Sequence, residues 1–184
     1  MQKQNKVSIL IAVFLVIAAA LSKVIMFPFN FSPMLGMAVF AGASFTNKRL
    51  AFALPIFAML LSDVLLEVAK PGAGFWGWGQ LVGYGIFALI TLFAFTMKKI
   101  NVVNVLIYSV SSAVIFFILS NLSYFLIDNP VYHTYTQDFK GFLACYDAAI
   151  PFLKISLEAA VVYSAILFGA YYAFQNFAAK KAVA

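Results

Sequence analysis

The sequence predicts an all-α, polytopic integral membrane protein, a single helical bundle that extends over residues 1–184. Hydrophobic residues make up 65% of the chain and charged residues only 10%, and the mean hydropathy is +0.99. Soluble domains average about 45–50% apolar and about 25% charged residues. The apolar residues form long runs, and most basic residues stand in pairs between those runs. A water-soluble fold of this size has no core large enough to bury so much apolar surface.

The apolar runs predict about six transmembrane helices. A helix rises about 1.5 Å per residue, so about 20 apolar residues cross a hydrocarbon core of about 30 Å. The predicted spans are 7–26, 34–45, 50–68, 77–97, 102–127 and 148–177. The second span is too short to cross unless it is tilted inside the bundle or extended at its start. The longest loop is expected at residues 128–140, and Asp147 is expected to cap the last span.

The basic residues predict the orientation of the bundle. Eight of the 12 fall on one side of a six-span topology, namely Lys3, Lys6, Lys48, Arg49, Lys98, Lys99, Lys180 and Lys181. The positive-inside rule makes that side cytoplasmic, together with both termini, in the inner (plasma) membrane. The first run also ends near Ala18-Ala19-Ala20, as a cleaved signal peptide does, and this alternative stays open.

The net charge of +6 does not indicate a nucleic-acid partner. The basic residues flank apolar runs, where membrane proteins carry them, and the lipid bilayer is the expected partner. The sequence contains no Gly-rich phosphate loop, Cys-x-x-Cys or His-rich motif. We therefore expect no cofactor, no bound metal and no nucleotide hydrolysis by this chain.

Of the carboxylates inside predicted spans, two are candidate functional residues. Asp63 lies near the outer end of the third span and Glu158 well inside the last, four residues after Lys154 on the same helix face. A charge in a bilayer costs about 2.5–3.5 kcal/mol, so such groups face a cavity or one another. They predict either a polar pocket in the outer half of the bundle or a structural ion pair of Lys154 with Glu158 or Asp63.

Three further polar groups stand at the outer ends of spans. Asn30 and Ser32 lie in a proline-bounded loop, where they either face the mouth of the bundle or satisfy their own turn. Asn121 and Tyr124 lie near the end of the fifth span, where an amide bonds a ligand or a neighbouring helix.

The third group precedes the last span. Cys145 and Tyr146 border the predicted pocket. Cys145 suits a soft-metal ligand, a nucleophile or a small half-buried residue. We expect Asn30, Ser32, Asp63, Asn121, Tyr124, Cys145, Tyr146 and Glu158 to bind the substrate, with no catalytic or metal-binding residues.

Small residues on two spans predict close helix packing. Gly79 and Gly83 form a G-x-x-x-G step that Gly85 extends, and Ala38 with Gly42 form a similar face on the second span.

Several of these stretches resemble an uncharacterised bacterial membrane family of about this length. They are Asn30-Phe31-Ser32-Pro33 and the residues 38–43, 60–63, 120–121, 145–152 and 167–169. The Lys154–Glu158 segment departs from that family, whose members often carry Asn-Thr-Leu and Gly-Asp there. The family is in turn similar to the substrate-binding S components of energy-coupling-factor (ECF) vitamin transporters. This resemblance rests on size, six spans, a short second helix and outer polar loops.

The resemblance implies a six-helix module that holds a small vitamin-like or metabolite-like molecule in an outward-facing pocket between its helices. It would move that molecule inward alone or with an energising ATPase and transmembrane coupling subunits. We expect no enzymatic activity, because the sequence carries no specific catalytic motif. Two alternatives stay open: an assembly subunit without a ligand, and a membrane enzyme acting through Asp63, Glu158 or Cys145.

Overall fold

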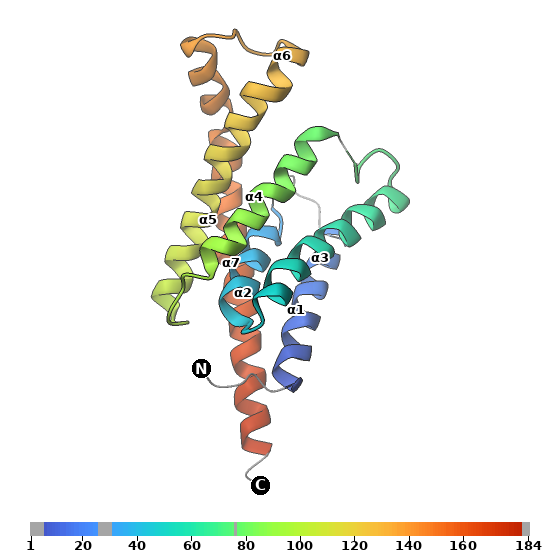
Figure 1. Ribbon diagram of the computed structural model, residues 1–184, viewed down its shortest axis with the longest axis vertical. Helices are drawn as coiled ribbons and strands as arrows, with labels where there is room; N and C mark the ends of the chain where they lie inside the picture. The colour runs from blue at the N-terminus through green and yellow to red at the C-terminus, as the bar shows by residue number, and fades with distance from the viewer. Residues whose placement is uncertain (1–5, 26–30, 76, 182–184) are drawn as a thin grey trace.

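The computed structural model describes residues 6–25, 31–75 and 77–181, and there the chain is helical between short connections (Figure 1). These residues form six helical rods: α1 Lys6–Ile25, α2 Met34–Ser44, α3 Lys48–Ala69, α4 Trp78–Ala94, α5 Val102–Ser123 with its continuation, and α7 Phe139–Lys181. The continuation of α5 runs through the π-helix η1 Tyr124–Asp128 into α6 Asn129–Tyr132. The all-helical class predicted from the sequence is confirmed.

Four of these rods are long and apolar enough to cross a membrane. The qualifying segments are Lys6–Val24, Lys48–Ala69, Val102–Tyr132 and Phe139–Phe177. The helices α2 and α4 are apolar but shorter. At about 1.5 Å per residue, α2 is only about 16 Å long, half the thickness of a hydrocarbon core. The chain therefore has the helices of a membrane protein, and six complete crossings stay a prediction.

The short helix α2 forms the centre of the bundle. Its residues from Met34 to Gly42 are all buried, so it has no polar face. Phe40 packs edge-on against two rings of α7, with centroids 5.1 Å from Phe168 and 5.5 Å from Tyr171. A methyl group built on Gly42 would lie 2.6 Å from the Ala94 Cβ of α4. The close packing predicted for Gly42 is therefore confirmed.

The polar loop predicted at 128–140 is mostly helical, and this prediction was wrong. The fifth helix continues to Tyr132, and α7 begins at Phe139 rather than near residue 148. His133 ends the rod in the left-handed conformation, with φ 51°. Asp138 accepts the Gly141 N–H at 2.7 Å and the Thr136 hydroxyl at 2.8 Å, and these two bonds lower its pKa. Asp138, and not Asp147, therefore caps the last helix.

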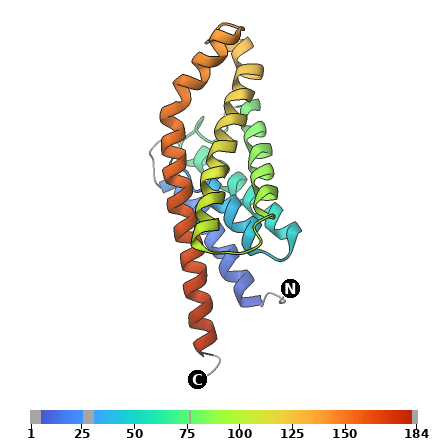
Figure 2. The same ribbon diagram turned by 90° about the vertical axis from the view of Figure 1, so that its left-hand side faces the viewer.

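Two helical hairpins diverge at one end of the molecule. The rod of α5 and α6 and the helix α7 form the taller hairpin, and α3 with α4 form the shorter one (Figures 1 and 2). Towards the connection at residues 133–138, α4 leans away from α5 (Figure 1). A cavity lies where these hairpins separate.

Candidate functional site

A cleft of about 200 Å³ lies between α4 and α5 at the diverging end. One wall carries polar side chains of α1, α3 and α4: Lys23, Asp63, Gln80 and Tyr84. The facing wall carries those of α5 and η1: Ser120, Ser123, Tyr124 and Asp128. Apolar side chains complete the lining, namely Met34, Met59, Val82, Ile86, Phe87 and Phe116. The cleft thus combines a few polar groups with apolar and aromatic walls, as small-molecule sites do.

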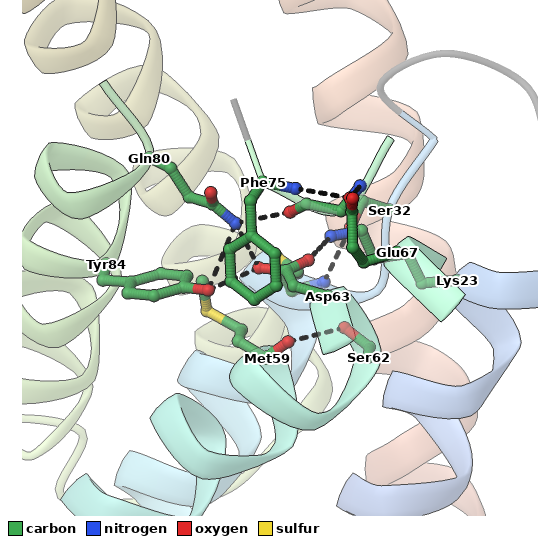
Figure 3. Close-up of polar contacts among 11 residues, drawn as sticks. Lys23, Ser32, Met59, Ser62, Asp63, Glu67, Phe75, Gln80 and Tyr84 are labelled. Atoms are coloured by element: carbon green, nitrogen blue, oxygen red, sulfur yellow. Dashed lines mark hydrogen bonds and ion pairs between the residues drawn. The ribbon is translucent and has the colours of Figure 1, made fainter. Parts of the chain in front are cut away.

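Asp63 is the centre of the first wall (Figure 3). It is only 2% exposed, and its Oδ1 accepts a hydrogen bond and ion pair from the Lys23 ammonium. Its Oδ2 accepts the Gln80 amide N–H at 2.8 Å and the Tyr84 hydroxyl at 2.5 Å. Both oxygens are therefore occupied, which offsets the cost of burying a carboxylate in a helix that is apolar enough to cross a membrane.

The turn between α3 and α4 sets the position of this wall. Glu67, one helical turn after Asp63, accepts the N–H groups of Gly72 and Gly74, each at 2.9 Å. The Gly74 carbonyl in turn accepts the Gln80 amide at 2.8 Å. A Cβ at Gly74 would lie 2.1 Å from the Asp63 carbonyl oxygen, so only glycine allows this close approach.

The facing wall depends on the π-helical turn. Ser120, Tyr124 and Asp128 are spaced by four residues. In a regular α-helix, residues at this spacing drift steadily around the axis, because one turn takes about 3.6 residues. The turn Tyr124–Asp128 is π-helical and takes more residues, so it offsets the drift and returns Asp128 to the cleft face.

Of the seven predicted site residues that the structure describes, two line this cleft, Asp63 and Tyr124. The sequence did not single out Lys23, Gln80 and Tyr84, because Lys23 stands at the end of the first span and the other two are uncharged. The spacing of Gln80 and Tyr84, one helical turn apart, was the available signal.

Three other predicted residues join α5 to α7 instead. Tyr146 donates its hydroxyl to the Ile118 carbonyl of α5 at 2.7 Å. Cys145 is 3% exposed, and its thiol lies 4.0 Å from the Asn121 carbonyl oxygen. The Asn121 amide donates to the Phe117 carbonyl of its own helix at 2.7 Å. The contact of Cys145 agrees with the alternative of a small buried residue, whereas the Asn121 amide bonds its own helix and not the neighbouring helix that was predicted. Both residues also border a second cavity of about 200 Å³ between the helices.

Ser32 and Glu158, the other predicted site residues that the structure describes, do not line this cleft. The Ser32 hydroxyl is 3.5 Å from the Met34 N–H, at the start of α2. Asn30 lies outside the described residues. Glu158 and Lys154 are both exposed on α7, and no ion pair joins them. The predicted pairing of Lys154 with Glu158 or Asp63 was therefore wrong: Asp63 takes Lys23 as its partner, and the side chains of Lys154 and Glu158 point outward from the bundle.

We expect Lys154→Met and Glu158→Gln to change stability independently. With no contact between the two side chains, the double variant should lose the sum of the single losses to within about 0.5 kcal/mol. Thermal or denaturant unfolding of the four proteins in one detergent measures this coupling. A coupling energy above about 1 kcal/mol would show that the two charges pair in the folded protein.

Gly83 and Gly85 of α4 do not form the predicted packing face. A Cβ built on Gly83 or Gly85 meets no atom within 4 Å, and Gly79 and Gly83 line the cleft. At Gly83 the G-x-x-x-G step therefore leaves room for the cleft.

A comparison with protein families places the whole chain in one of them. The chain belongs to a family of unknown function (DUF6580), which matches residues 3–182. This confirms the predicted membership of an uncharacterised family. No curated protein and no solved structure matches the chain, so the similarity to ECF S components stays a prediction.

Proposed function

We propose that this member of the family binds a small molecule in the cleft between α4 and α5, as the substrate-binding step of membrane transport. One observation carries the proposal: a fully hydrogen-bonded buried carboxylate, Asp63, borders an open cavity between two diverging hairpins. Ionisable groups inside transmembrane helices typically mark substrate or ion pathways. A bundle held together by packing alone has no need for such a group beside an open cavity.

The distribution of charge gives the proposed direction. Three basic pairs stand at the helix ends that lie farthest from the cleft. They are Lys48-Arg49 at the start of α3, Lys98-Lys99 after α4 and Lys180-Lys181 at the end of α7. By the positive-inside rule, the cleft opens to the outside of the plasma membrane and both termini are cytoplasmic. In a mechanism like that of ECF transporters, an ATPase and a transmembrane coupling subunit would move the molecule inward.

An assembly role is the second candidate, and the outer face of α7 supports it. Lys154 and Glu158 are exposed on a helix that is apolar enough to cross a membrane. Charged groups on such a face are stabilised by a partner or by water rather than by lipid. This observation does not concern the cleft, so both roles are compatible with one molecule.

The cleft is tested by filling it without removing any polar group. A leucine at Gly83 would occupy the open space on the cleft wall, whereas a leucine at Gly85 would face away from the cleft. The two variants stand on the same helix and carry the same substitution, so their effects on helix propensity match. Native mass spectrometry after gentle purification measures the small molecule retained per protein.

We expect Gly83→Leu to weaken the affinity for the retained molecule by at least about tenfold. This change corresponds to about 1.4 kcal/mol of steric obstruction. Gly85→Leu should keep it. Equal retention by both folded variants, or no retained molecule in the unsubstituted protein, would contradict transport-type binding and favour the assembly role.

A further inference from the structure

The charges that line the cleft do not balance. Lys23 is the one basic side chain among the described lining residues, and it already pairs with Asp63. The remaining carboxylate is Asp128, on the facing wall. Among the lining residues that the structure describes, the cleft therefore carries one uncompensated negative charge.

Asp128 is free to receive a ligand. It is half-buried, and no described side chain or N–H group bonds its carboxylate, which does not cap the helix that follows it. Asp63, by contrast, has both oxygens occupied by Lys23, Gln80 and Tyr84. A ligand that carries a positive charge gains a charge-assisted hydrogen bond at Asp128 without breaking the network around Asp63.

The rest of the lining suits an apolar body. Phe87 of α4 and Phe116 of α5 stack with ring centroids 5.2 Å apart, and the methionines Met34 and Met59 lie in the same lining. Aromatic faces attract organic cations, and methionine side chains adapt to irregular or flat ligands. The cavity volume of about 200 Å³ limits the body to roughly one ring.

We infer that the ligand is a small organic cation, a protonated amine on a body of about one aromatic ring, with Asp128 as its counter-ion. This inference rests on the proposed binding function of the cleft. It favours an organic monocation over a divalent metal, because Mg²⁺ or Ca²⁺ takes about six or more oxygen ligands and Asp128 offers a single free carboxylate.

Three probes of nearly identical shape test the charge preference. They are 2-phenylethylamine, 2-phenylethanol and phenylacetate, which are positive, neutral and negative at pH 7. Titration calorimetry of each into the purified full chain gives three affinities. We expect the amine to bind at least about tenfold more tightly than the alcohol, the effect of one charge-assisted hydrogen bond, and the acid to bind most weakly.

Asp128→Asn should abolish the preference for the amine, because the amide keeps the shape of the side chain and removes its charge. Asp147→Asn is the matched control, since Asp147 is an exposed carboxylate of α7 outside the cleft. It should leave the three affinities unchanged. Equal binding of the three probes, tightest binding of the acid, binding of none, or an equal effect of the two variants would each overturn the inference.

The two experiments together distinguish a wrong ligand class from a cleft that binds nothing. If native mass spectrometry finds a neutral or anionic molecule that Gly83→Leu excludes, the cleft is a binding site and the ligand class is wrong. If no molecule is retained and none of the three probes binds, both proposals fail.

Discussion

Removing one partner of the Lys23–Asp63 pair is expected to cost the protein about 3–5 kcal/mol of unfolding free energy, as breaking a buried ion pair typically does. Asp63 is 2% exposed and the Lys23 side chain 25% exposed, so neither charge reaches bulk water freely. Asp63→Asn leaves the Lys23 ammonium without its counter-ion but keeps an acceptor for the hydroxyl of Tyr84. Lys23→Met leaves the Asp63 carboxylate with neutral donors only. Each single variant therefore holds an unpaired charge, whereas the double variant holds none.

A double-mutant cycle measures the coupling. The four proteins, with Lys23→Met, Asp63→Asn, both or neither, are unfolded in the same detergent by heat or denaturant. The double variant should be less destabilised than the sum of the single losses by more than about 1 kcal/mol. The exposed residues Lys154 and Glu158 provide the matched control cycle, because they have no mutual contact and should show additive losses. Additive losses in both cycles would show that Lys23 and Asp63 do not pair.

The second large effect is expected at the contact between α2 and α4. Gly42→Ala should lower the free energy of unfolding by about 1–3 kcal/mol, the usual cost of overpacking a buried site. The added methyl would lie 2.6 Å from both the Ala94 Cβ and the Thr91 carbonyl oxygen. Neither atom belongs to a flexible side chain, so the two helices have to separate.

A glycine of α7 supplies the control for this substitution. A Cβ at Gly169 meets no atom within 4 Å, so Gly169→Ala should stabilise its helix by about 0.5–1 kcal/mol, the usual difference between glycine and alanine in a helix. The two variants are compared by thermal unfolding in the same detergent. If Gly42→Ala were as stable as Gly169→Ala, α2 and α4 would not approach as closely as the structure shows.

The sequence by itself determined the class of the protein and the rough extent of its helices. Apolar runs report the free energy of moving each segment into lipid, a local property that needs no tertiary information. The sequence also indicated that Asp63 is exceptional, because a carboxylate inside a span needs hydrogen bonds or a counter-ion to offset its desolvation cost. The close approach at Gly42 was also predictable, since small residues on a buried helix have few other roles.

The tertiary structure alone decided which polar groups meet. Lys23 and Asp63 are 40 residues apart, and Asp63 and Gln80 are 17 apart, so no helical periodicity connects them. Their meeting depends on how α1, α3 and α4 cross, which packing against α2 sets.

The continuation of α5 through the π-helical turn was hidden for another reason: the sequence pattern at Asp128 and Asn129 is typical of a loop. In the fold, Asn129 is buried and bonds the backbone of Tyr135, and Asp128 turns toward the cleft. The burial and hydrogen bonding of Asn129 outweigh its local preference for a turn, and only the tertiary arrangement supplies that burial.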